Sequence, residues 1–113
     1  MQREIKKYLF DILDCINSIE DYTVNTKTYS EFNNSKKTFR AVERELEIIG
    51  EIIVRLRDSK AEVNIVNSAK IIGLRNRIAH DYENINDDII WGIYKNHVPL
   101  LKKEIQDLLK ANS

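Results

Sequence analysis

The sequence predicts an all-α protein, a four-helix up-and-down bundle with one short extra helix. Long stretches of the chain place apolar residues at spacings of three and four, the period of one face of an α-helix. Only three glycines and one proline interrupt the 113 residues, whereas a fold of many short strands needs more turn residues. The length fits a single domain covering residues 1–113.

The first helix is expected from about Gln2 to Asp21. Its apolar stripe consists of Ile5, Leu9, Ile12, Ile16 and Ile19. The stretch from Tyr22 to Lys37 is rich in Thr, Asn, Ser and Lys, which are typical of loops and caps. Within it we expect a short turn through Glu31 and Phe32, capped by Ser30, with the Phe32 side chain in the core.

A second long helix is expected from about Ser35 to Arg57, with Asn34 or Ser35 as its N-cap. Its apolar stripe consists of Phe39, Val42, Leu46, Ile49, Ile53 and Leu56. Gly50 lies inside this helix, where glycine costs roughly 1 kcal/mol relative to alanine. Close approach of another backbone would compensate for that cost, and an accident of drift explains the glycine equally well.

Two further helical regions follow. Asn67 or Ser68 can cap a third helix, whose apolar residues are Ile71, Leu74 and Ile78. Asn86 is the best cap for the last region, whose apolar residues are Ile89, Ile90, Ile93, Leu101, Ile105 and Leu108. Pro99 removes a backbone donor, so we expect a kink or break near Asn96 to Val98.

The charge balance excludes strong non-specific attraction to nucleic acid, because 18 basic and 18 acidic side chains give a net charge of zero. Any RNA site must therefore come from a local patch. Four basic residues could extend such a patch, namely Lys36, Lys37, Arg40 and Arg44. Their acidic neighbours Glu43, Glu45 and Glu47 favour a solvated helix face instead.

Several other classes of protein are excluded. Cys15 is the only cysteine, so we expect neither a disulfide framework nor a thiolate metal cluster. Asp11 and Asp14 interrupt the apolar character of the N-terminal region, which argues against a signal peptide. No stretch approaches the length of a membrane span. We expect a cytoplasmic protein that needs no metal and no cofactor.

Side chains suited to chemistry concentrate in one stretch, Ile71 to Tyr82, in the order Arg-x-x-x-x-His-x-Tyr. The ring nitrogens of His80 can give or take a proton near neutral pH. The planar guanidinium of Arg75 matches a phosphate, and Tyr82 adds a hydroxyl that can be modified. This combination is suited to phosphate chemistry.

The run from Arg75 to Tyr82 resembles the signature of the HepT-like branch of the HEPN-domain ribonuclease toxins. Three flanking segments resemble that family in the same order: Ile71 to Leu74 before the motif, Leu46 to Glu51 in the second helix, and Asp88 to Leu101 in the last one. The resemblance covers nearly the whole chain. One departure is Lys60 to Asn67, where relatives often carry a Pro and a Trp.

The resemblance implies a HEPN-type homodimer in which two copies of the motif line one cleft. It also implies metal-independent cleavage of RNA, for which we expect Arg75 and His80 to be catalytic. Two neighbours are supporting candidates: Asn76 could orient a neighbouring side chain, and Arg77 is a solvated or phosphate-steering charge. The usual partner is a small nucleotidyltransferase antitoxin of the MNT type, encoded beside the toxin. That partner blocks the toxin and adenylylates the motif tyrosine, which here is Tyr82.

Helical geometry limits how the motif can work. Residues five apart on an ideal helix are offset by roughly 140°, so Arg75 and His80 do not share a face. With the apolar stripe buried, Arg75 flanks the core and His80 points away from it. Either the helix loosens near Ala79, or a second chain completes the site.

Other interpretations remain open. The chain could be a non-catalytic helical subunit that partners a nucleotidyltransferase, or a plain dimeric scaffold. A lone histidine near a helix end is usually a surface or cap residue, which would apply to His80 without the resemblance. Trp91 and Tyr94 are better explained as core or interface than as a base-stacking platform, and His97 as structural.

Overall fold

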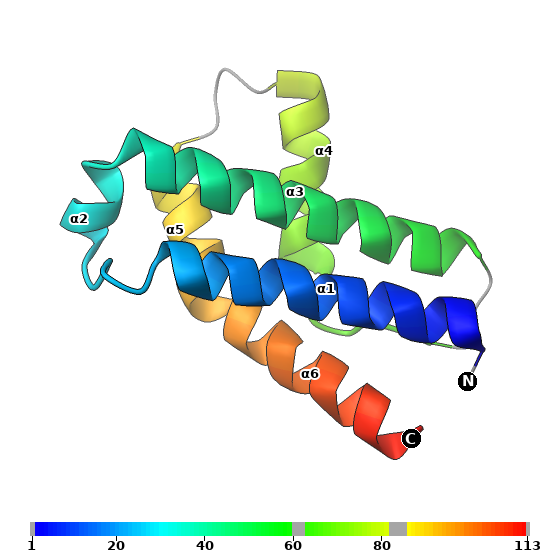
Figure 1. The fold of residues 1–113 in the computed structure, drawn as a ribbon. Helices are drawn as coiled ribbons and strands as arrows, with labels where there is room; N and C mark the ends of the chain where they lie inside the picture. Colours follow the sequence, from blue (N-terminus) through cyan, green and yellow to red (C-terminus); the bar gives the residue numbers. More distant parts are fainter. Residues whose placement is uncertain (1, 60–62, 82–85, 113) are drawn as a thin grey trace.

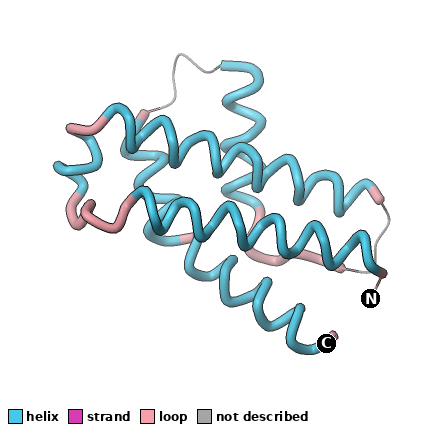
Figure 2. The backbone as a smooth tube through the Cα atoms, in the orientation of Figure 1, coloured by secondary structure: helices cyan, strands magenta, loops and turns pink. Residues whose placement is uncertain are grey.

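The computed structural model describes residues 2–59, 63–81 and 86–112, and every regular element in these ranges is a helix (Figures 1 and 2). The helices are α1 (Arg3–Tyr22), α2 (Tyr29–Asn33), α3 (Lys36–Asp58), α4 (Ala69–Asp81), α5 (Asp87–Asn96) and α6 (Val98–Ala111). The expected all-α bundle with a short extra helix is confirmed. In the described part of the chain, no helix is long and apolar enough to cross a membrane.

The core lies between α1 and α3 and extends to buried residues of α4, α5 and α6. Helices α1 and α3 lie side by side and run antiparallel, while α6 packs against α1 (Figure 1). The predicted stripes are buried, and their fully covered members include Leu9, Ile12, Ile16, Ile19, Val42, Leu46, Ile49, Leu101 and Ile105. The helical period therefore identified the buried faces of the long helices correctly.

Helix α2 begins earlier than the sequence suggested. Its N-cap is Thr28, whose side-chain oxygen accepts a hydrogen bond from the Glu31 N–H at 3.1 Å. The Glu31 carboxylate accepts from the Thr28 hydroxyl and from the Lys27 N–H, much as in a capping box. The expectation that Ser30 caps this turn is wrong. The helix begins at Tyr29, and the Thr28 and Glu31 side chains accept hydrogen bonds from the backbone N–H groups at its start. Phe32 is fully buried, as expected.

The predicted starts of α3 and α5 and the predicted break before α6 agree with the structure. Ser35 caps α3, and its hydroxyl oxygen accepts a hydrogen bond from the Thr38 N–H. Asn86 occupies the N-cap position of α5, although its side chain makes no capping hydrogen bond. The last helical region breaks at His97, and Pro99 falls in the first turn of α6, where a missing N–H costs nothing.

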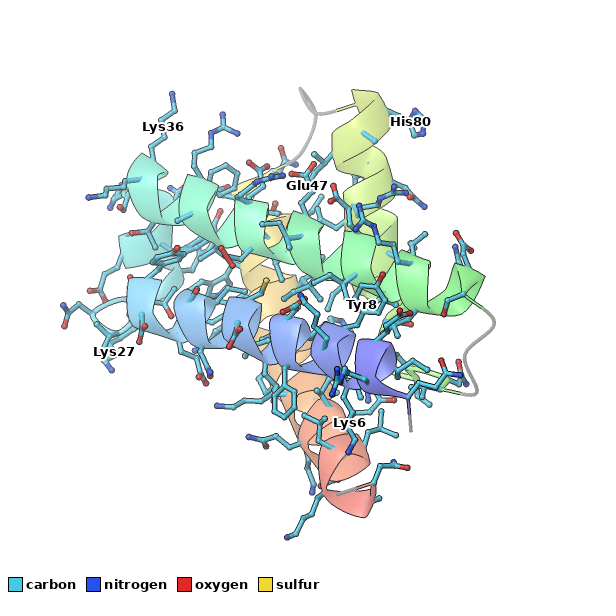
Figure 3. All side chains as sticks on the ribbon, turned by 45° about the vertical axis from the view of Figure 1, so that its right-hand side comes forward. Lys6, Tyr8, Lys27, Lys36, Glu47 and His80 are labelled. Carbon is cyan, nitrogen blue, oxygen red and sulfur yellow. The ribbon has the colours of Figure 1, made fainter. Side chains whose placement is uncertain are left out.

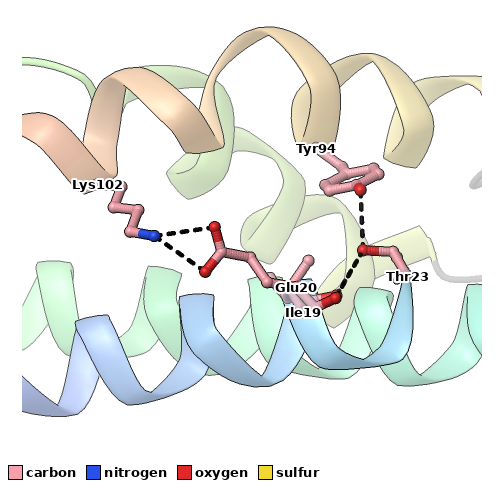
Figure 4. Close-up of polar contacts among 5 residues, drawn as sticks. All are labelled: Ile19, Glu20, Thr23, Tyr94 and Lys102. Carbon is pink, nitrogen blue, oxygen red and sulfur yellow. Dashed lines mark hydrogen bonds and ion pairs between the residues drawn. The ribbon is translucent and has the colours of Figure 1, made fainter. Parts of the chain in front are cut away.

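Polar contacts join the end of α1 to α5 and α6 (Figure 4). The Tyr94 hydroxyl donates to the Thr23 hydroxyl at 2.8 Å, and the Thr23 hydroxyl donates to the Ile19 carbonyl at 2.7 Å. Lys102 forms an ion pair with Glu20 at 2.9 Å. These contacts satisfy the buried Thr23 side chain and hold the two C-terminal helices against α1.

An aromatic cluster joins α2 to α5. The Trp91 ring packs against Phe32, with ring centroids 5.3 Å apart, and against Tyr94 at 5.6 Å. Tyr29 meets Trp91 edge-on at 6.1 Å, and the Lys95 ammonium lies over the Trp91 and Tyr94 rings. These contacts favour the interpretation of Trp91 and Tyr94 as packing residues at the margin of the core.

Candidate active site

Helix α4 carries the described part of the motif and crosses α3 (Figure 1). In its first turn, the Ile72 N–H donates a backbone hydrogen bond to the Ser68 carbonyl at 2.9 Å. Ile71 and Leu74 are buried, and Ile78 is half-buried, so the predicted apolar stripe faces the bundle. The outer end of α4 extends beyond α3, so the motif lies at an edge of the bundle.

Gly50 is the point of closest approach between α3 and α4. A Cβ atom at Gly50 would lie 2.8 Å from the Cβ and 3.2 Å from the Cγ of Arg75, and 3.3 Å from the Ile71 carbonyl oxygen. The first of these distances is too short for two carbon atoms. Of the two explanations for a glycine here, close approach of another backbone is therefore confirmed. The absence of a side chain lets the stem of Arg75 lie directly against α3.

The head of Arg75 is oriented by its neighbour. Arg75 is half-buried, and its Nη1 donates a hydrogen bond to the Asn76 Oδ1 at 3.0 Å. A guanidinium has five N–H donors, so this one bond leaves other donors of Arg75 able to contact a phosphate. Asn76 thus acts on Arg75, in line with the suggestion that it orients a neighbour.

His80 lies apart from Arg75 within one chain. Figure 3 shows His80 at the outer end of α4, pointing away from the bundle, and its side chain is exposed. The backbone stays α-helical from Ala69 to Asp81, so the helix does not loosen near Ala79. One subunit therefore does not bring the two groups together. Arg77 is exposed on the same helix, and Tyr82 lies outside the described residues.

Two of the four basic residues that could extend a basic patch on α3 are paired with acidic neighbours. Arg40 pairs with Glu43 at 3.1 Å, and Arg44 pairs with Glu47 at 2.7 Å. Both arginines are largely exposed, so these are solvated surface pairs of small energetic value. At Arg40 and Arg44 these pairs favour the interpretation of a solvated helix face.

Cys15 is a poor nucleophile. Burial, together with the nearby Glu45 carboxylate, raises the pKa of its thiol to about 12. The thiolate is the reactive form, so almost none of it is present at neutral pH. Among the described residues, no three His, Cys, Asp or Glu side chains gather in a way that could hold a metal ion.

Sequence patterns did not single out one residue that contacts the segment before the motif helix. The Glu104 carboxylate of α6 accepts hydrogen bonds from Val66 and Asn67, just before α4. The available signal was weak: an acidic residue close to the apolar residues Leu101 and Ile105 in the sequence. No sequence pattern predicted which residues Glu104 would contact.

Comparisons with known proteins agree with the motif. The family model described as "Ribonuclease HepT-like" matches residues 12–108. A Methanocaldococcus jannaschii protein provisionally named an RNase is 38% identical over 96% of this chain and 90% of its own length. The "Probable ribonuclease HepT" of Thermococcus cleftensis is 32% identical over 97% of this chain and 100% of its own. No solved structure matches significantly. The chain belongs to the HepT-like ribonuclease family.

Proposed function

We propose that this protein is a metal-independent RNA endonuclease and the toxin of a HEPN/nucleotidyltransferase toxin–antitoxin pair. The observation that carries the proposal is the placement of the motif on α4, a continuous helix on which Arg75 is half-buried and His80 is exposed at the outer end. The similarity to relatives named as ribonucleases supports RNA as the substrate.

The proposed chemistry needs a base, an acid and a group that stabilises charge. One His80 accepts the proton of a ribose 2′-hydroxyl, and the freed oxygen attacks the adjacent phosphorus atom. The bond from phosphorus to the 5′-oxygen breaks, and a second, protonated His80 gives its proton to that oxygen. Arg75 holds the phosphate and stabilises its added negative charge. The products are a 2′,3′-cyclic phosphate and a 5′-hydroxyl.

A homodimer supplies the second His80. Helix α4 packs mainly on α3, and Asn76, Arg77 and His80 on it are exposed. A Cβ atom at Gly73 would meet nothing within 4 Å, which is consistent with an open face. We propose that two copies of α4 face each other across one cleft in a cytoplasmic dimer, with one Arg75 and one His80 from each subunit.

A cleavage assay tests the nuclease activity and its mechanism together. Protein freed of its partner and of any adenylyl group is expected to cut an RNA oligonucleotide in the presence of EDTA. The same oligonucleotide with 2′-deoxy sugars should stay intact, because it lacks the attacking hydroxyl. Cleavage of the deoxy substrate, or cleavage only after a metal is added, would contradict the proposed mechanism.

Regulation is proposed to act through Tyr82. A nucleotidyltransferase partner would transfer AMP from ATP to the tyrosine oxygen and release pyrophosphate. Intact mass spectrometry after co-expression with that partner is expected to show additions in steps of one AMP that map to Tyr82. A Tyr82→Phe protein should gain none, and an unchanged pattern of additions in that variant would place the modification elsewhere.

The second candidate is a non-catalytic subunit that partners a nucleotidyltransferase. The net charge of zero favours it, because nucleic-acid-binding proteins usually carry a basic surface. In that case unmodified protein would leave RNA intact, form a stable complex with the transferase, and cause no growth defect when expressed alone.

A further inference from the structure

The segment just before α4 is held to α6 by hydrogen bonds to one carboxylate, that of Glu104. Glu104 Oε2 accepts a hydrogen bond from the Val66 N–H at 2.6 Å. Its Oε1 accepts from the Asn67 N–H and from the Asn67 side-chain amide, both at 2.9 Å. Glu104 thus binds two successive backbone N–H groups and one side-chain amide, although it lies 37 residues after Asn67 in the chain.

The hydrogen bonds of Glu104 act on a well-defined turn. Ile65 is buried, and its carbonyl accepts a hydrogen bond from the Ser68 hydroxyl at 2.8 Å. Val66 is 73% exposed, so its side chain contributes little to holding the turn in place. Hydrogen bonds to a carboxylate are roughly twice as strong as those between neutral groups. Glu104 is therefore the main polar contact that fixes where α4 begins.

The position of the first turn of α4 matters because the helix is rigid, so a displacement at its start changes the position of its outer end. From Ser68 to His80 the helix rises about 18 Å at 1.5 Å per residue. Arg75, at the contact with Gly50, lies about 7.5 Å along the helix from His80, so a tilt of about 8° around that contact moves the outer end by about 1 Å. Packing on α3 around Gly50 holds the middle of the helix, while the hydrogen bonds of Glu104 hold its start. Together they define the direction of the helix.

We propose that Glu104 is a positioning residue for RNA cleavage: its carboxylate sets the direction of α4 and thereby the placement of His80 relative to Arg75. The inference rests on the proposed role of those two residues. Other contacts hold α6 itself, including the buried Leu101 and the Lys102–Glu20 ion pair. Loss of the Glu104 carboxylate is therefore expected to loosen the start of α4 and leave the bundle folded.

Three variants test this role. Glu104→Ala is expected to lower kcat for RNA cleavage roughly tenfold, with a smaller change in KM, because misplaced catalytic groups slow the chemical step more than binding. Glu104→Gln should lose less, since its amide keeps one acceptor oxygen for Asn67. Lys102→Ala removes a different long-range polar contact of the same helix, the ion pair with Glu20, and should keep the wild-type kcat.

Amide hydrogen exchange separates this proposal from the proposed function. In Glu104→Ala, the amides of α4 should exchange faster than in the wild-type protein, while those of α1 and α3 keep their rates. A wild-type kcat in Glu104→Ala, or an equal loss in Lys102→Ala, would overturn the positioning role. If the wild-type protein cleaves no RNA, the proposed function fails instead. In that case unchanged exchange in α4 would show that Glu104 does not hold the helix either.

Discussion

Replacing His80 with alanine is expected to lower kcat for RNA cleavage by roughly 10²–10⁴-fold, the usual contribution of a general acid or base. His80 is exposed at the outer end of α4, so the melting temperature should change little. His97, the other histidine, lies at the junction of α5 and α6 and provides the control. His97→Ala should keep its kcat, and a His80→Ala protein as active as the wild type would remove His80 from the mechanism.

Mixed dimers test whether two His80 side chains share one cleft. If one acts as base and the other as acid, only dimers with two wild-type subunits cleave RNA at the full rate. Activity in exchanged mixtures of wild-type and His80→Ala subunits should then follow the square of the wild-type fraction. An equal mixture would retain about one quarter of the wild-type activity, given one cleft for each twofold dimer. A linear dependence would mean that each subunit carries a complete site.

The fold could be predicted from the sequence where local patterns decide the structure. Burial of one helix face requires apolar residues at a fixed period, so the stripes on α1 and α3 identified both helices and their buried sides. The cap of α3 at Ser35 and the break at His97 also followed from single residues. The cap of α2 could not be predicted from a single residue, because Thr28 and Glu31 form it together.

The candidate site could be predicted only in part. The motif and the helical period predicted that Arg75 and His80 lie on different sides of one helix, and the structure keeps that helix continuous from Ala69 to Asp81. The sequence could not identify the partner of Gly50 or the role of Glu104. Both depend on how helices distant in the chain cross and pack, and no local periodicity encodes that crossing.

Alanine at Gly50 is expected to destabilise the protein by about 1–3 kcal/mol, the usual cost of overpacking a well-packed interior. The new Cβ would lie 2.8 Å from the Arg75 Cβ and 3.3 Å from the Ile71 carbonyl oxygen. Neither atom can turn away by side-chain rotation, so α4 itself must shift from α3. The shift would also displace Arg75, so kcat for RNA cleavage should fall together with the melting temperature.

Gly92→Ala supplies the matched control for this prediction. Gly92 lies inside α5, where a Cβ would meet nothing within 4 Å. Alanine there should stabilise the protein by roughly 0.5–1 kcal/mol, because it lowers the entropy of the unfolded chain without a clash. In denaturant titrations, the free energy of unfolding should therefore fall for Gly50→Ala and rise for Gly92→Ala, although the substitution is the same. Equal stabilisation at both sites would mean that α4 can move away from α3 at no cost, and that Gly50 does not fix the position of Arg75.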